Sequence, residues 1–194
     1  MRSASMLRIA FTMPEPAPDE ARRIAMLLDD GWDYVHLRHP GLSQADTASI
    51  LRGIPEDMAA KIVIHDHFDL ARDFNIAALH LNSRNPSAPG WYTGAVTASC
   101  HAISEVMHAG PHRYVTLSPI FDSISKPGYL RAFTPAQLEQ LSDSRVDVIA
   151  LGGINSENIS EVSCLPFAGY AVMGALAWHH DLYNFKKSYR CFSL

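Results

Sequence analysis

The feature that most constrains the fold of this chain is a regular alternation of short apolar runs with longer amphipathic or polar stretches. Each run is short enough to form a buried strand. There are eight of them: Leu7–Phe11, Tyr34–Leu37, Ile62–Ile64, Ala77–Leu81, Gly94–Ala98, Tyr114–Leu117, Val148–Leu151 and Gly169–Met173. Strands that alternate with helices predict a parallel sheet with right-handed crossovers. Eight such units close naturally into a barrel.

The stretches between the runs predict helices, several of them short. Residues 19–29 place Ile24, Leu27 and Leu28 at helical spacing and stop before Gly31. Shorter candidates cover residues 43–51, 67–73, 104–107, 135–141 and 156–162, and the tail from Trp178 to Leu194 is expected to close the barrel. At 194 residues the chain is shorter than a typical barrel of about 250 residues. We therefore predict one α/β domain over residues 1–194, a compact (β/α)8 TIM barrel with some shortened helices.

An open, doubly wound sheet is the structural alternative to the barrel. Such a fold has fewer strands and usually a glycine-rich turn after the first strand. Residues 12–15, Thr-Met-Pro-Glu, do not supply that turn. The barrel is therefore the expected architecture.

Composition excludes some classes of partner. The formal net charge is −4 and no run is rich in Lys or Arg, which argues against nucleic acid. No stretch has the apolar length needed to span a bilayer, so no membrane partner is expected. Three widely spaced cysteines, Cys100, Cys164 and Cys191, do not suggest a disulfide framework and favour a reducing, cytoplasmic compartment. The aromatic tail leaves a homodimer contact as an alternative to barrel closure.

In a barrel of this kind, function concentrates in the loops after the strands. Past the second run, His36 and Arg38 fall on one strand face, and a guanidinium suits phosphate oxygens; a surface ion pair is the alternative for Arg38. Past the third run, the carboxylate of Asp66 suits a hard cation such as Mg²⁺, or it caps the following helix. His65 and His67 are two residues apart and also suit zinc, as in a metal hydrolase.

The fourth and fifth runs also contain or precede polar residues. His80 lies inside its run and is expected to be a hydrogen-bonded core histidine. Ser99 and His101 share a face if the fifth strand continues, but no acidic partner identifies a nucleophilic triad. Cys100, between them, is expected to be a packed thiol.

The last three strand ends predict an anion site. The loop over residues 118–129 holds hydroxyls, the cation of Lys126 and a Pro-Gly turn, which suit a phosphate or pyrophosphate. Gly152 and Gly153 follow the seventh run and allow close backbone approach ahead of a helix N-terminus. Gly174 follows the eighth run. Because the loops after strands seven and eight form the phosphate site of many barrels, we expect a small phosphorylated substrate.

Taken together and in this order along the chain, the strand-end segments described above resemble the thiamine phosphate synthase and thiazole tautomerase superfamily. The resemblance runs from about Leu7 to Ala177. The segments that support it are YVHLR at 34–38, IHD at 64–66, ALHL at 78–81, SCH at 99–101, SPIF at 118–121, KPG at 126–128 and ALGGI at 150–154. The resemblance implies a transferase of thiamine biosynthesis. Such an enzyme joins hydroxymethylpyrimidine diphosphate to thiazole phosphate, giving thiamine monophosphate and pyrophosphate.

The resemblance also implies roles for individual residues. It places Arg38 and Lys126 on the pyrophosphate and Asp66 on Mg²⁺, with a second metal ligand at Asn85. Metal and cations together would absorb the negative charge that develops on the leaving group. The residues placed around the substrates are His36, His65, Ser99, Ser123, Ser125, Gly152, Gly153 and Gly174.

Several positions depart from the synthase pattern. The family usually has Gln where His36 stands, Lys where Pro40 stands, Asn where His65 stands, and a carboxylate near Asn85. The pyrophosphate half of the site has therefore lost one cation and one anion. The His-x-Arg pattern resembles the tautomerase branch instead, which shifts a proton on the thiazole carboxylate phosphate; His101 would then be the acid–base residue. A non-catalytic phosphate-binding barrel is a further alternative.

Overall fold

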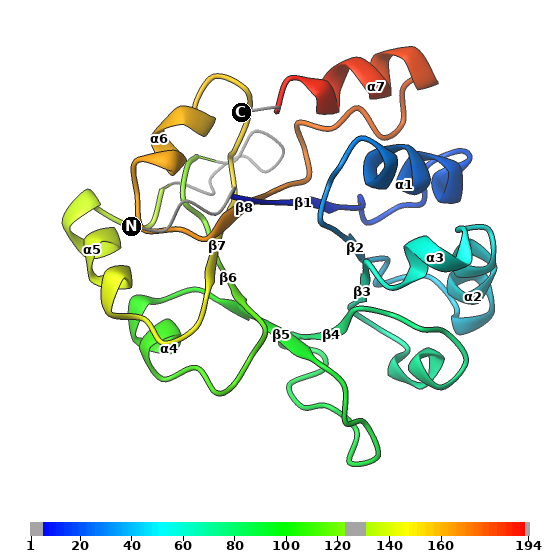
Figure 1. Ribbon diagram of the computed structural model, residues 1–194, viewed down its shortest axis with the longest axis horizontal. Coiled ribbons are helices and arrows are strands. Elements are labelled where there is room, and N and C mark those ends of the chain that lie inside the picture. Colours follow the sequence, from blue (N-terminus) through cyan, green and yellow to red (C-terminus); the bar gives the residue numbers. More distant parts are fainter. Residues whose placement is uncertain (1–5, 123–130, 193–194) are drawn as a thin grey trace.

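The eight strands form a closed barrel in which every neighbouring pair is parallel and the order follows the sequence (Figure 1). The structure, a computed structural model, describes residues 6–122 and 131–192. The strands are β1 (Leu7–Phe11), β2 (Tyr34–Leu37), β3 (Ile62–Ile64), β4 (Ala78–Leu81), β5 (Val96–Cys100), β6 (Val115–Leu117), β7 (Val148–Leu151) and β8 (Gly169–Val172). The predicted barrel is confirmed, and the open sheet is excluded because β1 pairs with β8.

Strand β5 differs from its prediction, because it begins two residues later than the apolar run and ends at Cys100. Just before the strand, the carbonyl of Ala95 accepts from the hydroxyl of Tyr92 and from the backbone N–H of Leu79 in β4, both at 3.1 Å. The pairing of β4 with β5 then starts at Val96. This shift places Ser99 inside the strand and His101 just after it.

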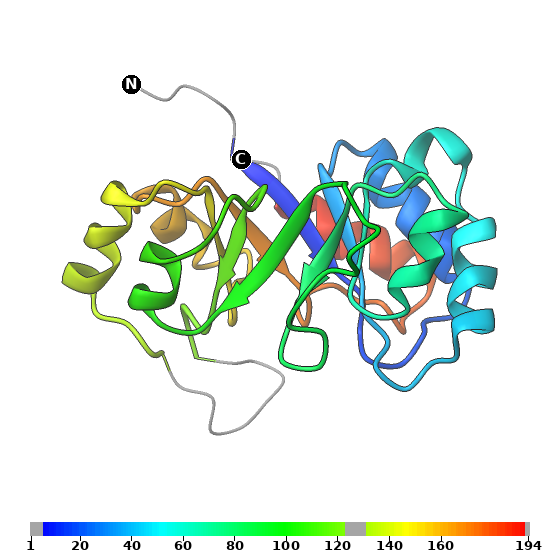
Figure 2. The same cartoon turned by 90° about the horizontal axis from the view of Figure 1, so that it is seen from below.

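Helices surround the barrel, and most are one to three turns long (Figure 2). They are α1 (Glu20–Asp29), α2 (Gln44–Arg52), α3 (Glu56–Ala59), α4 (Ile103–Met107), α5 (Pro135–Glu139), α6 (Ile159–Ser163) and α7 (Leu182–Arg190), with 3-10 helices η1 (Phe68–Arg72) and η2 (Gln140–Asp143). The shortened helices explain how 194 residues complete the barrel. Helix α3 was not predicted, since a single turn is too short to show helical periodicity.

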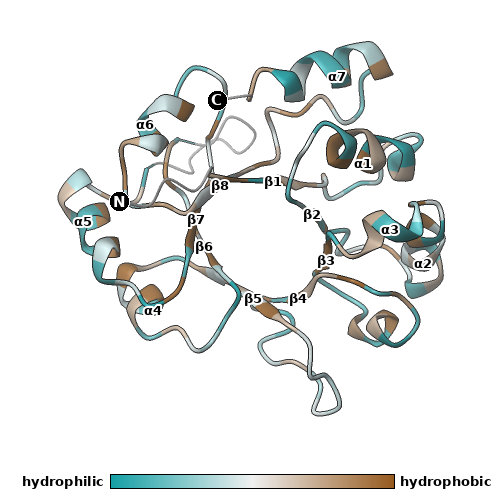
Figure 3. Ribbon diagram, viewed as in Figure 1, coloured by the Kyte–Doolittle hydropathy of each residue, from teal (hydrophilic) through white to brown (hydrophobic). Residues whose placement is uncertain are grey.

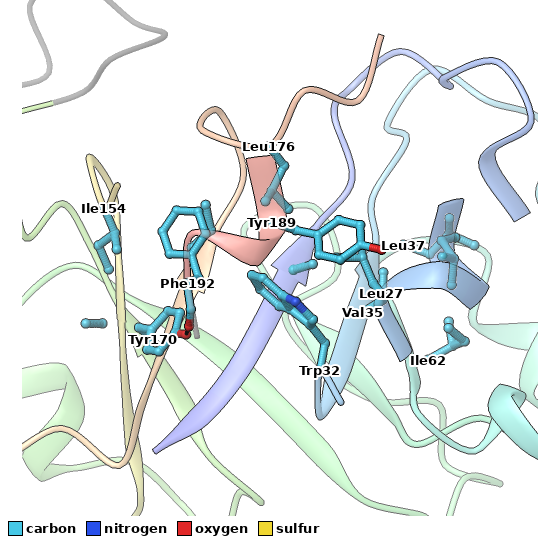
Figure 4. Close-up of a cluster of buried hydrophobic side chains, with 14 of the residues drawn as sticks. Leu27, Trp32, Val35, Leu37, Ile62, Ile154, Tyr170, Leu176, Tyr189 and Phe192 are labelled. Atoms are coloured by element: carbon cyan, nitrogen blue, oxygen red, sulfur yellow. Dashed lines mark hydrogen bonds between the residues drawn. The ribbon is translucent and has the colours of Figure 1, made fainter. Parts of the chain in front are cut away.

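The core lies between the strands and the surrounding helices, and Figure 3 shows hydrophobic residues concentrated on the strands. The C-terminal segment covers part of it (Figure 4). Trp32, Tyr170 and Phe192 pack ring against ring, and the hydroxyl of Tyr170 donates to the carbonyl of Phe192 at 2.7 Å. The prediction that the tail closes the barrel is confirmed. Among the described residues, no helix is long and apolar enough to cross a membrane.

Candidate active site

A cavity of about 650 Å³ lies at the ends of the strands where the predicted site residues were expected. Phe11, His65, Ser99 and Ala171 contribute to it from the strands and their ends. The loops that line it contribute Arg38 after β2, Asn82–Arg84 after β4, His101 after β5, Ser118 and Pro119 after β6, Gly152–Ile154 after β7, and Met173–Ala175 after β8. The topology thus brings residues from distant parts of the sequence to one end of the barrel.

Beneath the cavity lies a buried hydrogen-bonded network. Nδ1 of His36 lies 2.9 Å from Nε2 of His65, and Nε2 of His36 lies 2.6 Å from the hydroxyl of Tyr114. The ring of Phe11 stacks on His36 with centroids 4.2 Å apart. His36 is fully buried and does not line the cavity, so it reaches a substrate only through His65.

A second buried chain of hydrogen bonds fixes the proton on His80. The hydroxyl of Thr97 donates to the carbonyl of Leu79 at 3.4 Å, so its oxygen accepts from Nδ1 of His80 at 2.8 Å. Nε2 of His80 then has no proton and accepts from the hydroxyl of Ser99, also at 2.8 Å. His80 is therefore the hydrogen-bonded core histidine that was predicted, and it orients Ser99 at the cavity wall.

The three buried histidines are neutral at pH 7. Burial, followed by the charges of neighbouring groups, lowers the pKa of His36 and of His65 well below the usual range. Burial lowers the pKa of His80 to about 3. Their possible ligand atoms all lie within 4.8 Å of one another, a spacing that a metal ion could bridge. Tyr114 bonds to His36, Thr97 and Ser99 bond to His80, and the cluster found among the described residues contains no carboxylate, so the geometry favours a neutral network.

Arg38 lies at the end of β2 with its backbone held in place by Thr12. The backbone N–H of Arg38 donates to the hydroxyl of Thr12 at 2.9 Å. Its half-buried side chain lines the cavity, and within residues 6–122 and 131–192 no group hydrogen-bonds the guanidinium. Burial, then the positive charge of Arg84, lowers the pKa of Arg38. With the residues that the structure describes, Arg38 does not form the surface ion pair considered above, and its side chain is placed to bind an anion.

Asp66 is neutralised by Arg84, a residue for which the sequence pattern predicted no role. Arg84 donates from Nη2 to both carboxylate oxygens at 3.0 Å and from Nε to Oδ1 at 3.2 Å. Asn85 lies beside them, and its Nδ2 donates to Oδ1 at 3.1 Å. The helix-cap alternative for Asp66 is wrong, because η1 begins after His67 and has no side-chain cap.

These contacts do not fit the predicted Mg²⁺ site. Magnesium binds oxygen atoms, whereas Asn85 directs its nitrogen at Asp66. That orientation is fixed, since the same nitrogen also donates to the carbonyl of His65 at 2.9 Å. Both oxygens of the carboxylate are engaged by a guanidinium. Asp66 and Asn85 come together as expected, but with the hydrogen bonds of an ion pair.

His65 and His67 do not converge as a zinc site would require. His65 is directed to His36 inside the barrel, whereas His67, in a left-handed conformation at φ 54°, bonds through Nε2 to the carbonyl of Leu42 at 2.7 Å. The two residues fall on different sides of the strand end. The hydrolase alternative therefore loses its metal ligands.

Gly152 and Gly153 are required by the close approach of two loops. Both have positive φ, +96° and +68°, and a side chain on Gly153 would come within 2.8 Å of the backbone of Phe121. The backbone N–H of Phe121 donates to the carbonyl of Gly152 at 3.0 Å, so the β6 and β7 loops are joined here. With Gly174, these residues line the cavity opposite the β2 and β4 loops; their contact with an anion stays a prediction.

We expect Gly153→Ala to lower the free energy of unfolding by about 2 kcal/mol. Alanine is strained at this positive φ, and its methyl group would clash with the neighbouring backbone. Urea unfolding measures the change. Gly41→Ala is the matched control, since nothing lies within 4 Å of the added methyl group. Equal stability of the two variants would contradict this reading of the loop contact.

The remaining predicted residues have three different placements. His101 lines the cavity and is exposed, with Nδ1 close to the carbonyl of Ser118 at 3.2 Å, so a proton donor or acceptor there can reach a ligand. Cys100 is buried as predicted, and burial raises its thiol pKa to about 11. Ser123, Ser125 and Lys126 lie outside the described residues.

Comparison with known proteins agrees with this arrangement. Residues 10–176 match the family model described as thiamine monophosphate synthase. The thiamine-phosphate synthase of Methanoculleus marisnigri is 27% identical over 172 residues, 82% of this chain and 81% of that protein. A crystal structure of thiamine phosphate pyrophosphorylase from Bacteroides thetaiotaomicron superimposes with a TM-score of 0.81 at 34% identity, covering 96% of this chain and 97% of that one. The corresponding Pyrococcus furiosus structure, at 17% identity and a TM-score of 0.75, shares the fold.

Proposed function

Because this chain belongs to the thiamine monophosphate synthase family, we propose that it couples hydroxymethylpyrimidine diphosphate with thiazole phosphate to give thiamine monophosphate and pyrophosphate. It is a transferase of thiamine biosynthesis. The observation that supports the proposed reaction most directly is the charge layout of the cavity. Arg38 and Arg84 line one side, and the glycine turns at Gly152 and Gly174 line the other, so one cavity offers separate places for two phosphorylated groups.

The chemistry of this reaction needs positive charge more than a strong base. The bond between the pyrimidine methylene and the diphosphate oxygen breaks, and a bond from the methylene to the thiazole ring forms. Both electrons of the broken bond leave with the pyrophosphate. The guanidinium of Arg38 stabilises that developing charge, and it does so best in a cavity that excludes water. Lys126 is proposed to act on the same group.

Mg²⁺ is the cofactor that the family resemblance implies, and it would supply further positive charge to the leaving group. Asp66 and Asn85 do not fit it as they stand, so no step here is assigned to the metal. A homodimer and a cytoplasmic location stay predictions.

The tautomerase is the second candidate function, and one observation favours it. His101 is exposed to the cavity, with one ring nitrogen near Ser118 and the other directed to no residue that the structure describes. An imidazole in that position is within reach of a ligand and can act as a proton donor or acceptor.

An assay of the purified protein with both thiamine precursors tests the proposal, run beside a tautomerase assay. We expect coupling activity that survives His101→Ala within about tenfold, because bond formation requires no base at that position. The tautomerase reading predicts the reverse, with proton transfer lost in His101→Ala. A protein that binds phosphate yet is inactive in both assays would leave only the non-catalytic barrel.

A further inference from the structure

We propose that Arg84, positioned by Asp66 and Asn85, is a diphosphate-binding residue that supplies, with Arg38, the positive charge otherwise assigned to Mg²⁺. The inference rests on the proposed function for the identity of the ligand, a substrate that bears a diphosphate. Its basis is the ion pair between Arg84 and Asp66, which occupies the place where a metal site was predicted.

The geometry of the pair leaves part of the guanidinium free to bind. Arg84 meets Asp66 side-on, through Nε and Nη2. Nη1 has no hydrogen-bond partner within the described ranges 6–122 and 131–192. Arg84 lines the cavity, whereas Asp66 is not among the described residues that do so, and only 18% of its side chain is exposed. The carboxylate therefore lies behind the guanidinium, and the cation is the group presented to a ligand.

The surrounding turn holds this arrangement in place. The side-chain oxygen of Asn82 accepts from the backbone N–H of Arg84 at 3.0 Å and from that of Asn85 at 3.2 Å. The amide nitrogens of Asn82 and Asn85 both donate to the carbonyl of His65, at 3.1 and 2.9 Å. These bonds tie the β4 loop to the end of β3. A guanidinium fixed in this way loses less conformational entropy when it binds an anion.

The local charge balance also favours an anion. Arg38 and Arg84 interact unfavourably with each other, and Asp66 compensates only one of the two charges. The three groups together leave one uncompensated positive charge at this side of the cavity. A diphosphate oxygen between the two guanidiniums would relieve their repulsion, and planar forked donors suit phosphate oxygens.

The test is binding of inorganic pyrophosphate, measured by calorimetry with EDTA and again with excess Mg²⁺. We expect pyrophosphate to bind in EDTA, and Arg84→Gln to raise its Kd about 10- to 100-fold, as for a lost bond to a charged group. Asp66→Asn should change the Kd less, because an amide oxygen still accepts one bond from Arg84 and the loss of the carboxylate charge itself favours an anion. Arg190→Gln is the matched control, since Arg190 forms a similar pair with Asp30 at the surface.

Several outcomes would overturn the proposal. These are pyrophosphate binding that appears only with Mg²⁺, a Kd unchanged in Arg84→Gln, or no binding under either condition. Thermal unfolding of each variant identifies any that has lost its fold, and Arg84→Lys, which keeps the charge without the fork, then serves as the second variant, with weaker binding expected. A failure of the proposed function can be distinguished from a failure of this inference about Arg84. Pyrophosphate binding in EDTA that depends on Arg84, without any coupling activity, rejects the synthase and leaves Arg84 as an anion ligand.

Discussion

Replacing Arg38 by glutamine is expected to lower kcat/KM for thiamine monophosphate formation by about 100- to 1,000-fold, the loss typical when one fixed donor to a developing negative charge is removed. The guanidinium of Arg38 is half-buried, lines the cavity, and meets no hydrogen-bonding group within the described residues. Its interaction with the leaving pyrophosphate would strengthen as the bond to the methylene breaks, so the loss should appear in kcat as well as in KM. Steady-state kinetics with both precursors measures it.

Arg52→Gln is the control for this prediction, because Arg52 is exposed in the last turn of α2 and does not line the cavity. Its kinetics should match those of the unchanged protein. Arg38→Lys should recover part of the activity, since it restores the charge but not the two-pronged contact. If Arg38→Gln raised only KM, with kcat unaltered, Arg38 would bind the ground state and transition state equally, and its catalytic role would be rejected.

The barrel could be predicted from the sequence because each buried strand is a short apolar run between longer amphipathic or polar stretches. The runs at Leu7–Phe11, Tyr34–Leu37, Ile62–Ile64 and Val148–Leu151 coincide with β1, β2, β3 and β7. The family resemblance is likewise confirmed by the match over residues 10–176. The boundary of β5 could not be predicted, because it follows the backbone pairing with β4, which hydropathy does not report.

The site was predictable to a lesser extent, because position along a strand does not reveal partners. Asp66 and Asn85 were rightly placed near each other, but their ion-pairing neighbour Arg84 was given no role. One signal could have found it: Arg84 lies three residues past the end of β4, where the other site residues were sought. The alternation of side chains along a strand places His36 on the same face as Arg38, yet His36 is completely buried inside the barrel. Alternation predicts the face of a strand on which a side chain lies, but not how far that side chain is from the solvent.

Acidification below pH 6.5 is expected to destabilise the fold steeply, because three buried histidines stay neutral in the native state. Burial lowers the folded-state pKa of His36, His65 and His80, the last to about 3. Their unfolded pKa is about 6.5. The unfolded chain therefore binds more protons, so stability is fully present above pH 6.5 and is lost as pH falls below it. At pH 5, a histidine that stays neutral in the folded state costs about 2 kcal/mol, which is a sizeable part of the total stability of many domains.

Urea unfolding between pH 7.5 and pH 5 measures this dependence and separates it from the carboxylates, whose unfolded pKa values lie near 4. The double variant His36→Gln, His65→Asn supplies the residues that the family usually has at these positions. Below pH 6, we expect the free energy of unfolding to fall more steeply with pH for the unchanged protein than for the double variant, in which only His80 of the three remains. His108→Gln, at an exposed position, should keep the full slope.

Equal slopes in the unchanged protein and the double variant would mean that the network beneath the cavity accepts protons without unfolding. His36 is fully buried between the ring of Phe11 and the hydroxyl of Tyr114, so a charge there would have no contact with water, which is why we expect unfolding instead.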